Sequence, residues 1–185
     1  LDVSSFIAQR IAHDVQARDG LFIFAEQKNY SMPIQLEPVG FVKNTRNDLS
    51  DDHWGSIISE IELAEGIPTA SLDGIDAFSH VEIIFYFNKC EENGVVFSGH
   101  PRGNPEWPRV GIFSQRKKDR PNHLGLTIAT MVARNERTLT VKNLDAIDGT
   151  PVLDIKPVAR EFMVDADDVI QPAWMDELMQ DYWKE

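Results

Sequence analysis

The sequence predicts a mainly β protein, a sandwich or a barrel, on three observations. Residues 81–87 (Val-Glu-Ile-Ile-Phe-Tyr-Phe) are rich in β-branched and aromatic residues, and residues 137–142 alternate polar positions with apolar positions or threonine. Both patterns are typical of strands. Further segments of this kind follow one another without long intervening helices, as in sandwiches and barrels. The sequence contains no Gly-x-Gly-x-x-Gly motif, which disfavours a doubly wound nucleotide-binding sheet.

The remaining strands are expected between segments that favour turns. Turn residues gather at 72–74 (Leu-Asp-Gly), 102–105 (Arg-Gly-Asn-Pro) and 148–151 (Asp-Gly-Thr-Pro). The strands expected around them span residues 36–43, 57–63, 109–113, 124–133 and 152–156. Together these segments define a β domain over residues 34–160.

Both ends of the chain are expected to add helical segments to this domain. Residues 1–31 form an N-terminal extension in which apolar residues follow a rough helical stripe after Ser4 and Ser5: Phe6, Ile7, Ile11 and Val15. Residues 161–185 form an acidic C-terminal segment. Pro172 suits the first turn of a short helix there, whose apolar stripe of Trp174, Leu178 and Tyr182 is expected to pack on the β domain or on a partner subunit.

Composition places the chain among ordinary globular proteins. Its 185 residues, 42% of them hydrophobic, fit one domain with a substantial core. No apolar run approaches the roughly 18 to 20 residues that span a bilayer, so no membrane association is expected. Cys90 is the single cysteine and permits no internal disulfide, which is consistent with the cytoplasm.

Charge is distributed unevenly along the sequence. The net charge of −12 opposes nonspecific binding to phosphate backbones. Residues 161–185 carry eight acidic side chains and one basic side chain, whereas residues 102–120 carry six basic and two acidic ones, a net charge of +4. The basic side chains of that stretch are Arg102, Arg109, Arg116, Lys117, Lys118 and Arg120.

Polar, turn-rich segments that join directly to apolar strands are candidates for chemistry. Within residues 116–127, the arginines and an asparagine suit a carboxylate or phosphate, and Gly125 permits close backbone approach to a ligand. Residues 147–151 are either a simple strand connection or a loop whose backbone groups bind an adenine edge. His80, which follows residues 74–79, is a further candidate.

These segments also carry a resemblance to a known family. The matching blocks, in order, are residues 111–116 (Gly-Ile-Phe-Ser-Gln-Arg), 120–127 (Arg-Pro-Asn-x-Leu-Gly-Leu-Thr) and 148–157 (Asp-Gly-Thr-Pro-Val-Leu-Asp-Ile-Lys-Pro), with weaker matches at 38–42, 78–80 and 101–104. Over residues 34–160 the chain resembles the TsaA-like family, typified by tRNA methyltransferase O. The resemblance implies a compact β-barrel, usually dimeric, that uses S-adenosylmethionine to methylate N6 of a threonylcarbamoyl-modified adenosine in a tRNA anticodon loop.

The resemblance also implies a cofactor site built from loops. Its residues, carried over by position, are Arg116, Arg120, Asn122, Leu126, Thr127, Ile147, Asp148, Gly149, Thr150 and Pro151, with looser matches at His53, Asn88 and Lys89. The chain departs from the family pattern at His123, where proline is frequent, and at Asn88, where histidine is frequent. It also has only residues 161–185 where bacterial tRNA-modifying members carry a further domain.

The general base and the methyl acceptor stay open at this point. Asp148, Asp154 and His80 are the candidates for a base, and no catalytic residue is singled out. A small-molecule acceptor is the alternative to RNA, and a regulatory protein that only binds S-adenosylmethionine is the alternative to an enzyme. The five histidines, His13, His53, His80, His100 and His123, show no ligand spacing such as His-x-x-x-His, so we expect no metal site.

Overall fold

The structure is a computed structural model that describes residues 34–90 and 94–185. The elements described below belong to one compact unit, Gln35–Glu185. The helical extension expected over residues 1–31 lies outside the described residues. Within the described part of the chain, no helix has the length and apolar character needed to cross a membrane.

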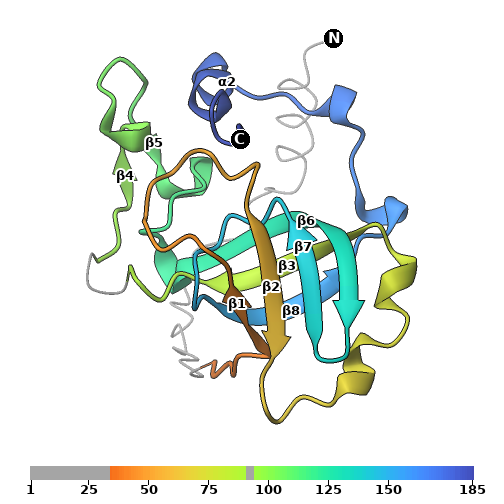
Figure 1. The fold of residues 1–185 in the computed structure, drawn as a ribbon. Helices are drawn as coiled ribbons and strands as arrows, with labels where there is room; N and C mark the ends of the chain where they lie inside the picture. The colour runs from red at the N-terminus through yellow and green to blue at the C-terminus, as the bar shows by residue number, and fades with distance from the viewer. Residues whose placement is uncertain (1–33, 91–93) are drawn as a thin grey trace, which may run out of the picture. The chain divides into compact units, whose positions relative to one another are not determined.

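Six antiparallel strands close into a barrel in the order β1-β2-β7-β6-β3-β8 (Figure 1). The strands are β1 (Gly40–Lys43), β2 (Ile58–Leu63), β3 (His80–Tyr86), β6 (Leu124–Asn135), β7 (Thr138–Lys142) and β8 (Pro151–Pro157). The barrel confirms the mainly β prediction and decides between the two architectures that the strand pattern left open.

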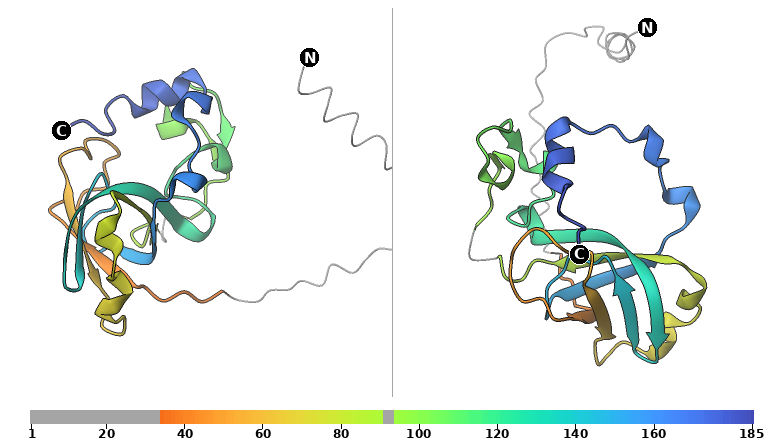
Figure 2. Two further views of the ribbon diagram at one scale, coloured as in Figure 1. Left: turned by 90° about the vertical axis from the view of Figure 1, so that its right-hand side faces the viewer. Right: turned by 45° about the horizontal axis from the view of Figure 1, so that its top comes forward.

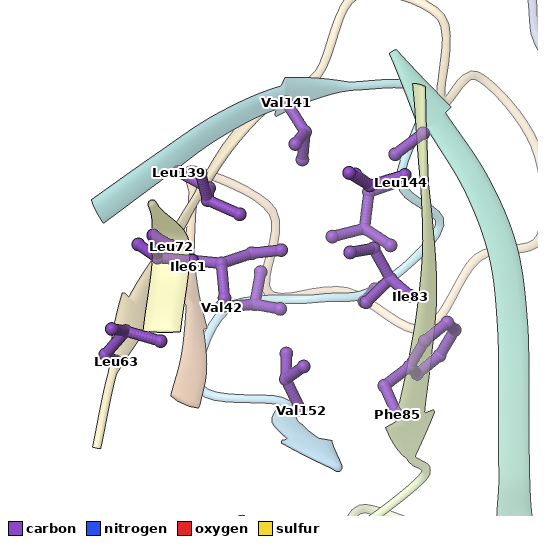
Figure 3. Packing of buried hydrophobic residues seen from close by; sticks show 13 residues of the cluster. Val42, Ile61, Leu63, Leu72, Ile83, Phe85, Leu139, Val141, Leu144 and Val152 are labelled. Carbon is purple, nitrogen blue, oxygen red and sulfur yellow. The ribbon is translucent and has the colours of Figure 1, made fainter. Parts of the chain in front are cut away.

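The barrel core follows from alternation along the strands. In β3 the side chains of Val81, Ile83 and Phe85 are buried, while the residues between them are partly exposed. Figure 3 shows side chains from several strands meeting in the interior, with Leu72 and Leu144 contributed by segments outside the strands. The fully or nearly fully buried cluster comprises Val42, Ile61, Leu63, Leu72, Val81, Ile83, Phe85, Ala129, Leu139, Val141, Leu144, Ala146 and Val152.

Two expected strands are shorter than predicted. β1 begins only at Gly40, although the Val39 amide already donates to the Val152 carbonyl at 2.8 Å. The segment expected as strand 109–113 contains only β5 (Val110–Gly111), which pairs with β4 (Ser98–Gly99) in a separate small sheet. At Ile112 the chain turns into the 3₁₀ helix η5 (Ile112–Ser114), closed by a hydrogen bond from the Gln115 amide to the Ile112 carbonyl at 3.1 Å.

Single 3₁₀ turns make up most of the remaining regular structure. They are η1 (Thr69–Leu72), η2 (Ile75–Ala77), η4 (Pro101–Gly103), η6 (Pro121–His123), η7 (Arg160–Phe162) and η8 (Ala166–Asp168). Short turns of this kind are common connectors, and here they join strands without adding a layer of helices.

The C-terminal segment leaves the barrel after β8 and returns to it. Residues 160–173 are exposed along their whole length and form the open blue arc in Figure 2. They lead to α2 (Ala173–Met179), which Pro172 precedes as the N-cap. Trp174 and Leu178 lie on α2 as predicted, whereas Tyr182 lies beyond its end, in the C-terminal tail (residues 180–185).

Three main-chain hydrogen bonds attach the C-terminal tail to the segment before β2. The amides of His53, Trp54 and Gly55 donate to the carbonyls of Asp181, Tyr182 and Lys184 at 3.1, 2.9 and 3.2 Å. The fit is close, because a Cβ built on Gly55 would lie 2.0 Å from the Trp183 carbonyl oxygen. The tail is therefore held against the barrel unit by its backbone as well as by its side chains.

Candidate functional site

A cavity of about 520 Å³ lies between the barrel and the C-terminal segment. Phe85 of β3 and Leu126 of β6 line it from the barrel, and Trp174, Leu178 and Tyr182 line it from α2 and the tail. Cavities of about 300–1,000 Å³ with mixed apolar and polar linings are typical of small-molecule and cofactor sites.

Gly125 lets the two barrel strands come together beneath this cavity. A Cβ at residue 125 would lie 2.4 Å from Cε2 and Cζ of the Phe85 ring, far inside van der Waals contact. Phe85 is itself only 1% exposed and forms an edge-to-face contact with Phe87, with ring centroids 5.2 Å apart. The glycine therefore has a packing role at a place where the sequence suggested close approach to a ligand.

The loop before β6 is held in shape by two arginines. Arg120 donates from Nη1 to the Gln115 carbonyl at 3.1 Å, and Arg116 donates from Nη2 to the Leu126 carbonyl. Asn122 and His123, both in η6, adopt positive φ values of 63° and 48°, a conformation that asparagine and histidine accept more readily than most residues. Arg116 lines the cavity, whereas Arg120 and Asn122 act on the form of the loop.

Arg46 organises the loop before β2, which also contributes to the cavity lining. Its guanidinium donates to the carbonyls of His53 and Ser50 at 2.9 and 2.8 Å and lies 3.8 Å from the centroid of the Trp54 ring. These contacts place Asp51 and Trp54 at the cavity. Sequence reasoning missed Arg46, since a lone arginine in a polar segment gives no sign that it is buried.

The loop between β7 and β8 divides into residues that line the cavity and residues that shape the loop. Ile147 and Thr150 line it. Asp148 instead accepts a hydrogen bond from the Asn44 amide at 3.0 Å, and the Gly149 amide donates to the Val42 carbonyl at 2.8 Å. Gly149 has a φ of 77°, the left-handed conformation that glycine adopts without strain.

Asp145, near the start of that loop, is the carboxylate that links the barrel to the tail inside the cavity. It accepts hydrogen bonds from Thr127 Oγ1 on β6 and from the Tyr182 hydroxyl in the tail. Burial, followed by the neighbouring Asp145 carboxylate, raises the pKa of Tyr182. The phenol therefore stays protonated and acts as the donor. Sequence reasoning did not single out Asp145; its only signal was its position two residues before the expected ligand loop.

Ion pairs neutralise much of the basic stretch where it meets the cavity. Lys118 pairs with Asp51 at 2.9 Å, and Lys117 pairs with Asp119 at 3.2 Å. Arg102 binds both oxygens of Asp52 at 2.6 and 2.8 Å. Asp119 is already included in the net charge of +4 counted along the sequence, but Asp51 and Asp52 lie outside residues 102–120, so that count overstates the positive charge at this surface.

The structure brings part of the predicted site together at the cavity. The predicted residues that line it are Asn88, Lys89, Arg116, Leu126, Thr127, Ile147 and Thr150. The predicted residues outside the lining are His53, Arg120, Asn122, Asp148, Gly149 and Pro151. Most of the second group lie next to a lining residue in the chain, so they act on the cavity through the backbone.

The three residues proposed as a base lie elsewhere. His80 bonds to the neighbouring Ser79 hydroxyl at 2.9 Å at the start of β3, and Asp154 pairs with Lys156 on β8. The Asp148 carboxylate accepts a hydrogen bond from the main-chain amide of Asn44. None of the three lines the cavity.

The lining suits a ligand that has a flat ring together with charged ends. The aromatic side chains of Trp174 and Tyr182 are partly exposed and provide surfaces for a ring, and carboxylates and basic groups lie along the same cavity. Burial raises the pKa of the Cys90 thiol, which makes it a poor nucleophile. Among residues 34–90 and 94–185, no group of three or more His, Cys, Asp and Glu side chains has the arrangement to hold a metal ion.

Comparisons with known proteins give a family and several relatives for this chain. Residues 51–165 match the family model described as the tRNA-methyltransferase O N-terminal domain. A protein of Methanothermobacter thermautotrophicus named "Probable S-adenosyl-L-methionine-binding protein" is 37% identical over 130 residues, which cover 68% of this chain and 90% of that protein. The tRNA (adenine(37)-N6)-methyltransferase of Rattus norvegicus is 36% identical over 135 residues, which cover 68% of this chain and 31% of that enzyme.

A solved structure shares the fold. The crystal structure of TrmO from P. aeruginosa superposes with a TM-score of 0.62 and 23% identity over 77% of this chain and 62% of that chain. This chain thus spans about a third of the rat enzyme and less than two thirds of the bacterial one.

Proposed function

The chain belongs to the family of the tRNA-methyltransferase O N-terminal domain, as its sequence motifs predicted, and we propose that it methylates N6 of an adenine in tRNA with S-adenosylmethionine as the methyl donor. The observation that carries the proposal is the cavity, which combines aromatic surfaces with unlike charges. S-Adenosylmethionine has the matching parts: a flat adenine, a sulfonium cation, and an amino acid end with one positive and one negative group.

When bound, the cofactor supplies an electrophilic methyl group on its sulfonium. The chain's own residues hold donor and acceptor in line and exclude water, and such alignment accounts for much of the rate of a displacement. We assign the cofactor to the loops at 116–127 and 147–151. Arg120, Asn122, Asp148 and Gly149 keep these loops in shape, and Arg116, Thr127, Ile147 and Thr150 line the cavity that would hold the cofactor.

We further propose that the adenine carries a threonylcarbamoyl group and that the enzyme works in the cytoplasm as a homodimer. The family and the names of the relatives support a tRNA substrate. A homodimer is supported by the exposed apolar side chains of β6 that lie outside the cavity, Leu124 and Val132, since a partner subunit would cover them.

A single experiment tests the proposal. The purified chain is incubated with S-adenosylmethionine carrying a labelled methyl group and with total tRNA from cells lacking the gene, and the RNA is then digested to nucleosides. We expect label in N6-methylated threonylcarbamoyladenosine. Calorimetry measures cofactor binding in parallel. Binding without transfer to RNA or to metabolites would identify a regulatory protein, and transfer to a metabolite alone would identify a small-molecule methyltransferase.

A matched pair of variants connects the cavity to cofactor binding. Leu126 lies on the outward face of β6 and lines the cavity, and Ile58 is equally exposed on β2, away from the cavity. Leu126→Glu places a charge against the ring surfaces, so it should weaken cofactor binding by about a hundredfold, on the order of 2.7 kcal/mol. Ile58→Glu should leave the affinity unchanged. Equal affinities in the two variants would move the cofactor out of this cavity.

A further inference from the structure

Asp145 differs from the other carboxylates that line the cavity. Asp51 is paired with Lys118 at 2.9 Å and Asp119 with Lys117 at 3.2 Å. Asp145 is bonded instead by two neutral hydroxyls, one on each carboxylate oxygen, from Thr127 and Tyr182. Within the described chain, no ion pair joins Asp145 to a basic residue.

The two hydroxyls fix the direction of this carboxylate. Thr127 belongs to β6, whose pairing with β3 is regular at this point, with Thr127 opposite Ile83. Tyr182 is held by the main-chain bond from the Trp54 amide to its carbonyl at 2.9 Å. Each carboxylate oxygen has two lone pairs, so one on each oxygen remains for a ligand. A negative group that is oriented by the protein and not neutralised suits a ligand group that carries an N–H or a positive charge.

We propose that Asp145 is a catalytic residue that binds the N–H of the methyl acceptor and takes its proton, with Thr127 and Tyr182 as positioning residues. The inference rests on the proposed methyltransferase function and names a residue for it. The acceptor nitrogen forms a bond to the methyl carbon, the carbon–sulfur bond electrons stay on sulfur, and the N–H bond breaks. The proton passes to an oxygen of Asp145. The sulfonium thereby loses its positive charge and the carboxylate its negative charge, so the net charge of the reacting groups is unchanged. A carboxylate at this place also stabilises the positive charge that develops on the nitrogen.

The test uses two cofactor analogues that differ at the reacting centre. S-Adenosylhomocysteine has a neutral sulfur there, whereas sinefungin has an ammonium group in place of the methylated sulfonium. Asp145→Asn keeps the shape of the side chain and removes its charge. We expect this variant to bind sinefungin at least tenfold more weakly while its affinity for S-adenosylhomocysteine changes by less than about twofold. Methyl transfer should fall by about a hundredfold or more, the usual effect of losing a proton acceptor.

Control variants separate this role from a structural one. Asp76→Asn makes the same chemical change at an exposed aspartate of η2 outside the cavity and should alter neither binding nor turnover. Tyr182→Phe removes one hydroxyl but keeps the carboxylate, so turnover should fall far less than in Asp145→Asn. Thermal melting checks that each variant folds.

Several results would overturn the proposal. Equal weakening of both analogues would assign Asp145 to the cofactor's amino group, and unchanged sinefungin binding would place it away from the reacting centre. Unaltered turnover in a folded Asp145→Asn protein would exclude the catalytic role. If the wild-type chain binds the cofactor and methylates nothing, the proposed function fails instead, and the analogue comparison still reports where Asp145 lies.

Discussion

Gly125 sets the distance between β6 and the Phe85 ring under the cavity. Because a Cβ there would lie 2.4 Å from two ring carbons, Gly125→Ala must displace a fully buried phenyl group. We expect the free energy of unfolding to fall by about 1–3 kcal/mol, as for other overpacked cores. Urea unfolding measures it. Gly111→Ala is the matched control, since Gly111 has a φ of −70° and no atom within 4 Å of its added Cβ. If the free energy of unfolding falls by a similar amount in the two variants, the Phe85 ring moves aside at little energetic cost.

Single residues also show where sequence reasoning reaches its limit. The Arg-Pro-Asn turn and the Asp-Gly-Thr-Pro turn were predicted as site loops because polar, turn-rich residues next to apolar strands form a local pattern. The contacts of Arg46 and Asp145 leave no such pattern in the sequence. Arg46 reaches the carbonyls of Ser50 and His53, and Asp145 meets a hydroxyl 37 positions away in the sequence. The returning tail sets the partner of Asp145, which a local pattern does not encode. The partners of Arg46 are only four and seven residues away, but they are main-chain carbonyls, which no residue type marks in the sequence.

Among the secondary-structure elements, the strands were easier to predict than their ends. The segment 81–87 became β3 with the expected alternation because every second side chain enters the core. The segment 109–113 kept only two strand residues, since its partner β4 is equally short and offers no further ladder. The prediction of a short C-terminal helix is confirmed, but none of the residues of α2 is buried, and Tyr182 reaches its partner from the tail after α2.

The C-terminal segment is the element whose removal should change the cavity most. Gly55→Ala tests this without truncation, because the added Cβ would lie 2.0 Å from the Trp183 carbonyl oxygen, a backbone atom. The tail must move away, and its aromatic residues leave the cavity with it. We expect faster hydrogen exchange over residues 173–185 and cofactor binding about tenfold weaker, which corresponds to about 1.4 kcal/mol.

Gly66→Ala is the control for this displacement. Its Cβ would meet no atom within 4 Å, so exchange in the tail and cofactor affinity should match the wild type. Unchanged exchange in Gly55→Ala would mean that the segment before β2 moves in place of the tail. Because α2 and the tail lie outside the family match over residues 51–165, this experiment also shows whether a segment beyond the shared barrel contributes to binding.

At the scale of the whole molecule, an acidic protein has to bind the anionic RNA that we propose as its substrate. The net charge is −12, and Asp51, Asp52 and Asp119 neutralise three of the six basic residues in the stretch 102–120. Arg109, next to β5, is exposed and donates to the Ser98 hydroxyl at 2.9 Å, and within the described chain it forms no ion pair. Long-range repulsion is screened beyond about 8 Å at physiological salt, so local groups of this kind decide whether RNA approaches the cavity.

Arg109→Glu is therefore expected to raise the KM for tRNA by about tenfold at low salt, with cofactor affinity unchanged because Arg109 does not line the cavity. The effect should shrink as salt is raised, since phosphate contacts act through displaced counterions. Arg160→Glu makes the same charge change on the exposed η7 turn and controls for the overall increase in negative charge. The measurement is the salt dependence of kcat/KM for both variants and the wild type. If the two variants lose activity equally, net charge governs the encounter and residues 102–120 form no RNA surface. If neither changes the salt slope, the acceptor is reached without phosphate contacts at Arg109, as expected for a small molecule.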